Sequence, residues 1–178
     1  STISNIIERR VGVGYAGRMT YRNIKNHYVL IGFNELSINM IRELYDECPS
    51  ARILLMSGME SATVRHRIQS ALPVEVERQV LVYFGNIESI EELQRLNIES
   101  AIEVYVLGDE ERYGRDAKNI AIVHLVSTLR GKCYDGKMMP VYVQFDSIPS
   151  YSNIQKMNLP PEVFCIEGKP NIFFRPFN

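Results

Sequence analysis

Six short apolar runs recur along the chain, and longer segments of mixed polar and apolar character separate them. The runs are rich in β-branched residues and tyrosine and show little polar alternation, which is typical of strands buried on both faces of a parallel sheet. We predict strands at residues 28–31, 51–57, 79–84, 104–107, 141–145 and 162–168.

Helices are predicted in the segments between these strands. Apolar residues recur at helical spacing after the first and second strands, at Leu36, Met40, Ile41, Leu44 and Tyr45 and then at Val64, Ile68 and Leu72. Ser89 and Glu92 form the S-x-x-E capping box of a helix start. Residues 115–130 are expected to form a long helix that Gly131 ends, and a short helical piece is expected at 151–157. The expected apolar face of the long helix consists of Ala117, Ile120, Ala121, His124 and Leu125.

Strands that alternate with helices indicate an α/β fold, because parallel neighbours need a crossover connection and a helix supplies it. We predict a Rossmann-like, doubly wound parallel sheet of about six strands with helices on both faces. In such sheets ligands bind outside the carboxyl ends of the strands, beside the first strand. The candidate cofactor-binding residues at that edge are Gly32, Asn34, Glu35, Leu36, Ser57, Gly85, Asn86, Gly108 and Asp109.

The turn after the first strand, "GFNELS", is a degenerate form of the dinucleotide-binding pattern G-x-G-x-x-G. Gly32 holds the first glycine position, whereas Asn34 and Ser37 stand where glycines would admit a pyrophosphate. The second strand ends in Ser57 rather than in the acid that grips a ribose, and the nearest acid is Glu60. Three interpretations of this turn are therefore open. It binds NAD(H) or an adenine nucleotide, it binds another ligand, or it is only packed against the rest of the fold.

A perfect match to the same pattern, "GVGYAG", lies at residues 12–17. A phosphate-binding loop must follow a buried strand and open an amphipathic helix, and neither pattern is present on its flanks. Three glycines in six residues favour left-handed or flexible backbone. We therefore interpret this match as a flexible turn.

Composition and charge narrow the class of protein. A chain of 178 residues suffices for one domain, and its net charge of −1 predicts no bulk attraction to nucleic acid. Residues 1–25, however, carry five Lys and Arg residues against Glu8 alone, as a solvated linker, a nucleic-acid arm or a segment beside a membrane would. No run approaches the length of a membrane span, and three scattered cysteines fit reduced thiols in a cytosolic protein.

No catalytic grouping is found. The sequence has no Ser-His-Asp motif, no Walker lysine loop and no Y-x-x-x-K near the predicted pocket. His27 is expected to anchor the start of the first strand, His66 to be solvated and His124 to lie in the core. The acidic group at Asp109, Glu110, Glu111 and Asp116 lacks the EF-hand order, and we interpret it as a solvated loop and helix start. Neither catalytic residues nor a metal site are predicted, so the chain is not expected to be an enzyme.

Three segments together resemble the TrkA-N, or RCK, domain that regulates potassium channels and transporters. They are "HYVLIGFNELSINMIRELY", "YFGNIESIEELQRLNIESAIEVYVLGDEE" and "DAKNIAIVHL", and the likeness covers residues 27–147. The residues that fall on the motif positions of that family are Gly85, Asn86, Leu93, Ile98, Ala101, Asp116 and Asn119.

The resemblance implies a ligand-sensing gating domain of a potassium or related cation channel or transporter. It implies a cytoplasmic domain tethered to the membrane, assembled with copies of itself as a dimer or gating ring, with a pore domain upstream. Residues 1–26 would then be a basic linker and 27–178 the Rossmann domain, which favours the membrane-proximal interpretation of the basic segment. The alternatives are a fragment of an NAD-dependent oxidoreductase or epimerase and a soluble nucleotide-sensing transporter subunit.

Four residues depart from the nucleotide site of that family: Asn34, Ser37, Ser57 and Asn86. In these departures the chain resembles the divergent members, including calcium-regulated and plant nuclear-envelope ion channels, more than the NAD-binding transporter subunits. The cofactor therefore stays unassigned at this stage.

Overall fold

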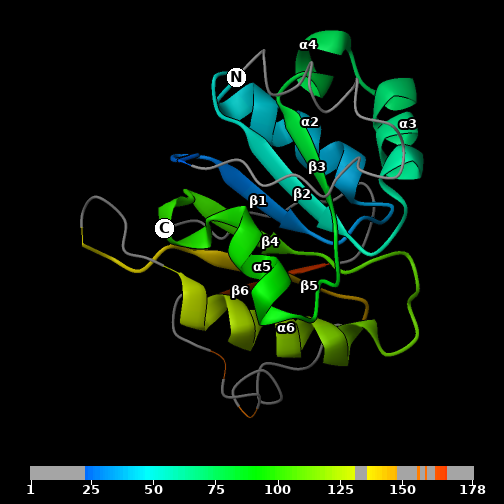
Figure 1. Cartoon of the computed structure of the whole chain (residues 1–178). Coiled ribbons are helices and arrows are strands. Elements are labelled where there is room, and N and C mark those ends of the chain that lie inside the picture. Colours follow the sequence, from blue (N-terminus) through cyan, green and yellow to red (C-terminus); the bar gives the residue numbers. More distant parts are fainter. Residues whose placement is uncertain (1–22, 131–135, 148–155, 157–158, 160–162, 168–178) are drawn as a thin grey trace.

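A six-stranded parallel sheet forms the centre of the molecule, in the order β3-β2-β1-β4-β5-β6 (Figure 1). The computed structural model describes residues 23–130, 136–147, 156, 159 and 163–167. The strands are β1 (Tyr28–Ile31), β2 (Ile53–Ser57), β3 (Val80–Phe84), β4 (Glu103–Val106), β5 (Val141–Phe145) and β6 (Val163–Glu167). Every neighbouring pair is parallel. The predicted Rossmann-like sheet is confirmed, and each strand begins and ends within two residues of its predicted bounds.

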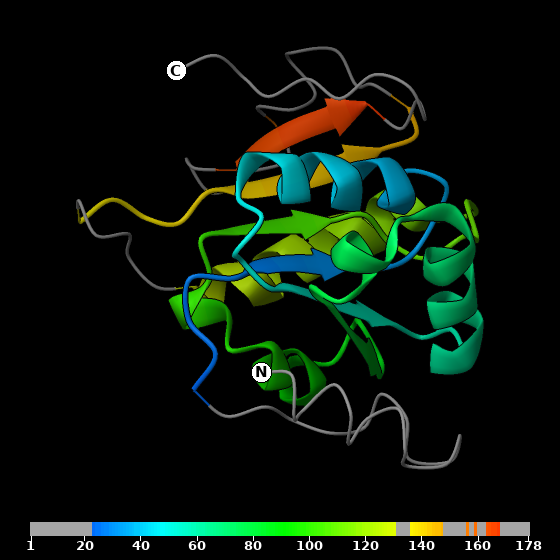
Figure 2. The ribbon, with the colours of Figure 1, turned by 90° about the horizontal axis from the view of Figure 1, so that it is seen from above.

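Helices cover both faces of the sheet, as Figures 1 and 2 show. They are α2 (Ser37–Glu47), α3 (Ser61–Ala71), α4 (Val74–Glu77), α5 (Ile90–Leu93) and α6 (Arg115–Leu129), with 3-10 turns at Gln94–Leu96 and Ile98–Ser100. Alternate residues of each strand point to opposite faces. Tyr28 and Leu30 pack with α2, α3 and α4 in one core cluster, whereas Val29 and Ile31 pack with α5 and α6 in the other.

The sheet-facing side of α6 differs from the prediction. Ile122, Val123 and Val126 are buried against the sheet together with the polar residue Asn119, whereas His124 is exposed. Asn119 was not among the residues of the predicted apolar face. The side-chain amide of Asn119 donates to the carbonyl oxygens of Leu107 and Gln144 at 3.0 Å each, so a polar residue lies on the buried side. Of the predicted face, Ile120 and Leu125 pack against the core, whereas Ala117, Ala121 and His124 are exposed, so the core position predicted for His124 is wrong.

Of two other local predictions, one is confirmed in part and one in full. The hydroxyl of Ser89 accepts a hydrogen bond from the amide of Glu92 at the start of α5, which is half of the predicted capping box. The other half does not form, because the amide of Ser89 donates to the carbonyl oxygen of Asn86 and the carboxylate of Glu92 pairs with Arg95. His27 is fully buried, and its Nε2 contacts the carbonyl oxygen of Leu96 at 2.9 Å, which fixes the start of β1. Burial lowers the pKa of His27, and the hydrogen bond to Leu96 opposes that shift only in part.

Several sequence predictions lie outside the described residues. These are the G-x-G-x-x-G match at 12–17, the helix stop at Gly131 and the short helical piece at 151–157 apart from Lys156. Within the described part of the chain, none of the helices combines the length and the apolar character that a bilayer crossing requires.

Candidate functional site

The candidate site lies at the carboxyl ends of β1, β2, β3 and β4, where the strand order reverses between β1 and β4. Two glycines bring the first and fourth strand ends into backbone contact. Gly32 has φ +96° and Gly108 has φ +77°, backbone values that residues other than glycine rarely adopt. A Cβ on Gly32 would lie 2.2 Å from the carbonyl carbon of Gly108. The base of the crevice between β1 and β4 is therefore closed by the main chain itself.

Asn34 joins the first turn to the ends of β4 and β5. Its side chain is buried, and its amide nitrogen lies 3.0–3.1 Å from the carbonyl oxygens of Leu107 and Gly108 and from Oε1 of Gln144. Its Oδ1 accepts a hydrogen bond from the amide of Leu36 at 2.9 Å. The residue at the second glycine position thus fills the space that a close phosphate would need and uses one of the amides of the turn.

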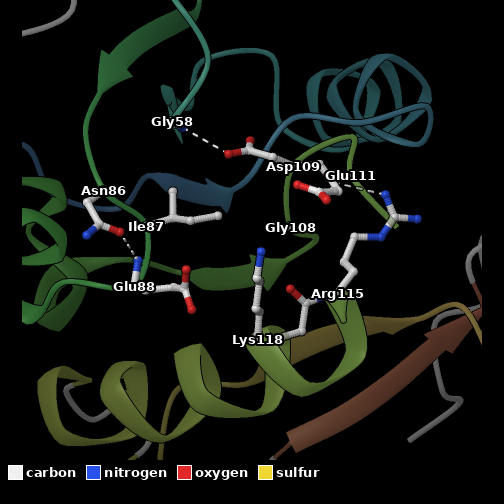
Figure 3. Close-up of a pocket in the computed structure, with 10 residues that line it drawn as sticks. Gly58, Asn86, Ile87, Glu88, Gly108, Asp109, Glu111, Arg115 and Lys118 are labelled. Carbon is white, nitrogen blue, oxygen red and sulfur yellow. Dashed lines mark hydrogen bonds between the residues drawn. The ribbon is translucent and has the colours of Figure 1, made fainter. Parts of the chain in front are cut away.

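Asp109 reaches from the end of β4 to the ends of β1 and β2. Its Oδ1 accepts hydrogen bonds from the amide of Phe33 at 2.9 Å and from the hydroxyl of Ser57 at 2.6 Å. Its Oδ2 accepts from the amide of Gly58 at 3.0 Å (Figure 3). The residue at the end of β2 therefore holds a carboxylate of the chain rather than presenting one to a ribose.

Five of the six backbone amides from Gly32 to Ser37 have hydrogen-bond acceptors elsewhere in the chain. Glu35 receives a hydrogen bond from its own backbone amide, which helps to lower the pKa of its carboxyl. The amide of Gly32 donates to the carbonyl oxygen of Met56, and that of Phe33 donates to the Asp109 carboxylate. The amide of Asn34 donates to the hydroxyl of Ser37, and the amide of Ser37 donates to the carbonyl oxygen of Asn34. The amide of Leu36 donates to the side chain of Asn34. A phosphate binds such a turn by accepting from its free amides. In this turn the amide of Glu35 alone has no acceptor beyond its own side chain, so the turn lacks the set of convergent free amides that the pyrophosphate of a dinucleotide needs.

An ion cluster around Arg115 closes the other side of the turn. The guanidinium is 2% exposed and donates to Asp146 at the end of β5, to Glu35 and to the carbonyl oxygen of Asp109. Burial opposes the charge on Arg115, but the two carboxylates outweigh it and raise its pKa. Burial likewise opposes ionisation of Glu35, and its own amide with Arg115 and Arg112 outweighs that effect and lowers its pKa.

Sequence reasoning missed Arg115, Gln144 and Asp146. The signal that could have found the last two is the rule that was applied to the first four strands, because the end of β5 meets the same edge. Asp116 was expected to lie at a solvated helix start. It lies in the first turn of α6, but its carboxylate accepts hydrogen bonds from the amides of Asp146 and Ser147 and so holds the end of β5.

A pocket of about 240 Å³ remains between the ends of β2, β3 and β4 and the start of α6. It is lined by Gly58, Asn86, Ile87, Glu88, Gly108, Asp109, Glu111, Arg115, Lys118 and Asn119. In Figure 3 the side chain of Lys118 extends into this pocket from α6, and Asn86 turns back to accept from the amide of Glu88 at 2.9 Å. Among the described residues, no group of three or more His, Cys, Asp and Glu side chains is placed to hold a metal ion.

The nine predicted site residues fall into four groups. Glu35 belongs to the ion cluster around Arg115. Gly32, Asn34, Ser57, Gly108 and Asp109 meet at the closed turn. Asn86 lines the pocket, with Gly108 and Asp109 on its opposite wall. Two predicted residues serve packing. Leu36 is buried in the core. Gly85 packs against the side chains of Glu92 and Arg95, since a Cβ added to Gly85 would lie 3.0 Å from an atom of each.

Comparison with solved structures identifies the fold. No protein-family model and no curated protein matches the chain. The crystal structure of the GsuK RCK domain superposes with a TM-score of 0.61 at 14% identity and covers 90% of this chain. The TrkA-N domain of the Escherichia coli inner membrane protein ybaL superposes at 0.53 with 15% identity over 82%. The chain has the RCK (TrkA-N) fold.

The RCK fold occupies a different share of each neighbour. This chain spans 30% of the GsuK RCK chain and 25% of the GsuK channel bound to NAD, but 90% of the ybaL TrkA-N chain. E. coli ADP-heptose lps heptosyltransferase II also superposes, with a TM-score of 0.50 and 13% identity, over 81% of this chain and 39% of that one. Because an enzyme shares the α/β architecture at this level, function must be argued from the site.

Proposed function

We propose that this RCK-fold chain is a regulatory domain of a potassium or related cation channel or transporter and is not an enzyme. The observation that carries the proposal is the likeness to the GsuK RCK domain over nine-tenths of the chain. Potassium-channel gating is here attributed to the chain by analogy with that neighbour.

The geometry of the site supports a mechanical role. Asn34, Asp109 and Arg115 tie the ends of β1, β2, β4 and β5 to one another through side chains. A ligand in the pocket beside α6 would therefore act on one connected edge rather than on a single loop. Such a ligand can shift the arrangement of domains only through different affinities for the two arrangements.

The test is a flux measurement on the complete gene product that contains this chain. Reconstituted in vesicles, it should carry potassium or rubidium, and the pocket variant Lys118→Ala should change the open fraction or its dependence on added ligand. Arg42→Ala, which removes an exposed cation from α2, is the matched control and should leave the flux unchanged. The proposal would be overturned if the native protein, Lys118→Ala and Arg42→Ala gave equal flux. It would also be overturned if the chain catalysed an NAD-dependent reaction.

The second candidate is a soluble subunit that serves a separate transporter. The ybaL comparison does not separate the two candidates, since the matched TrkA-N domain belongs to an inner membrane protein. Light scattering on the purified chain tests the shared expectation of self-assembly, and a dimer or larger ring is the expected result. Co-purification with a distinct membrane protein, instead of a pore in the same polypeptide, would favour the second candidate.

A further inference from the structure

The ends of β1 and β2 form a cradle of three hydrogen-bond donors. Two are the backbone amides of Phe33 and Gly58, and the third is the hydroxyl of Ser57. All three lie within 2.6–3.0 Å of one carboxylate. Convergent main-chain amides of this kind form an anion-binding site, because each N–H presents a fixed partial positive charge.

The anion in this cradle belongs to the chain. Asp109 follows Gly108, whose positive φ reverses the backbone at the end of β4 and directs the carboxylate over the end of β2. Gly108 in turn lies against Gly32, so the position of Asp109 is set by main-chain packing and not by a free rotamer alone. A tethered group has a high effective concentration at its site, which a free anion would have to exceed.

The rest of the turn offers no alternative site for a phosphate. The amides of five residues of the turn have acceptors elsewhere in the chain: Gly32, Phe33, Asn34, Leu36 and Ser37. The guanidinium of Arg115 contacts both the carboxylate of Glu35 and the carbonyl oxygen of Asp109, which brings a second negative charge to the same edge. Arg112 and Arg115 are directed to Glu35 rather than toward a ligand phosphate. The anion-binding capacity of this edge is thus already used.

We propose that Asp109 is a built-in anion that takes the place of a ligand phosphate and holds the switch point of the sheet closed. The native chain then accepts no pyrophosphate-bearing ligand at its first turn, in contrast to the NAD-bound GsuK channel, which has the same fold. Removal of the carboxylate uncovers a site for a small oxyanion such as formate or inorganic phosphate. This proposal holds whether or not the chain gates a pore.

The test follows the amides of Phe33 and Gly58 by ¹H–¹⁵N NMR of the full 178-residue chain. In Asp109→Ala, formate and inorganic phosphate should shift both signals saturably at constant ionic strength and raise the melting temperature, whereas chloride should not. Asp116→Ala is the matched control, because Asp116 also accepts from two backbone amides, those of Asp146 and Ser147, outside the cradle. In this control the signals of Phe33 and Gly58 should not respond. A folded Asp109→Ala protein without any anion response would overturn the proposal.

A second arm needs no variant and therefore does not depend on the stability of Asp109→Ala. The native chain is titrated with inorganic pyrophosphate and with ADP while the same two amides are observed. We expect no shift beyond that produced by chloride at equal ionic strength. A saturable shift of both amides in the native chain would show that the cradle is open to external phosphate and would overturn the proposal. Neither arm measures ion flux, so failure here is distinct from failure of the proposed function.

Discussion

At the scale of single residues, the replacement of two glycines explains the chemistry of the first turn. Asn34 and Ser37 stand where a nucleotide site needs glycine, and each supplies a side-chain acceptor for a backbone amide. The substitution changes more than the size of the position. It converts an anion-binding turn into one whose amide donors already have acceptors. An added phosphate could reach these amides only by breaking the existing hydrogen bonds.

Gly32→Ala should destabilise the fold strongly. The substitution adds a Cβ that would lie 2.2 Å from the backbone of Gly108 and places it at φ +96°. We expect a loss of about 3–5 kcal/mol in the free energy of unfolding, since backbone strain and a steric clash act together. Urea denaturation measures it.

Gly114→Ala is the control for that variant. Gly114 also has positive φ, at +69°, but nothing lies within 4 Å of its virtual Cβ. Only the cost of the backbone conformation remains, which is about 1 kcal/mol. Equal losses in the two variants would contradict the backbone contact between β1 and β4.

At the scale of elements, the start of β1 depends on a neutral histidine. Burial lowers the pKa of His27 below the value of about 6.5 in an unfolded chain, so the folded state binds fewer protons there. The free energy of unfolding should therefore fall as the pH drops below about 6.5, by at most about 1.4 kcal/mol per pH unit, until the folded pKa is passed.

His27→Gln tests this assignment. Glutamine can still donate to the carbonyl oxygen of Leu96 but does not titrate, so the contribution of residue 27 to the pH slope between pH 7 and 5 should disappear. His124→Gln, at an exposed position of α6, should keep the slope of the native chain. Urea midpoints at three pH values decide the matter, and identical slopes in all three proteins would contradict the role of His27.

The elements also mark where sequence reasoning succeeds and fails. The run at Tyr28–Ile31 could be predicted because all four residues are buried and their apolar character is local. The buried face of α6 could not, because Asn119 is polar and its acceptors are Leu107, just after β4, and Gln144 of β5. The role of Asp109 was equally hidden, since its donors are 51 to 76 positions away in the chain. Apolar patterns report local burial, whereas polar contacts between distant strand ends depend on the assembled sheet.

At the scale of the whole molecule, one buried guanidinium links three strand ends. Arg115→Met leaves the carboxylates of Glu35 and Asp146 without their shared cation, and we expect a loss of about 2–4 kcal/mol in stability. Arg112→Met removes another cation from the same Glu35, but Arg112 is 68% exposed and its loss should cost less than about 1 kcal/mol. Thermal denaturation of the two variants side by side provides the measurement, and equal effects would refute a special role for Arg115.

The closed turn also predicts how the native molecule responds to nucleotides. A ligand that binds only the folded state at 100 times its Kd stabilises it by about 2.7 kcal/mol. NAD, NADH and ADP should produce no such rise in melting temperature with the native chain. A clear rise with any of them, together with a saturable shift of the Phe33 and Gly58 amide signals, would place a nucleotide at the first turn and contradict the closed site.

The position of β1 in the sheet has a mechanical consequence. The strand that follows residues 1–26 is an inner one, held by parallel ladders of four residue pairs to β2 and four to β4. His27 and Asn26 add backbone hydrogen bonds to Ile102 and Ser100 at its start. Tension applied along the preceding segment would load both ladders in shear at once, whereas an edge strand can be peeled from one side. That segment is thus joined to the molecule at a point where it can transmit a pull without unravelling the sheet.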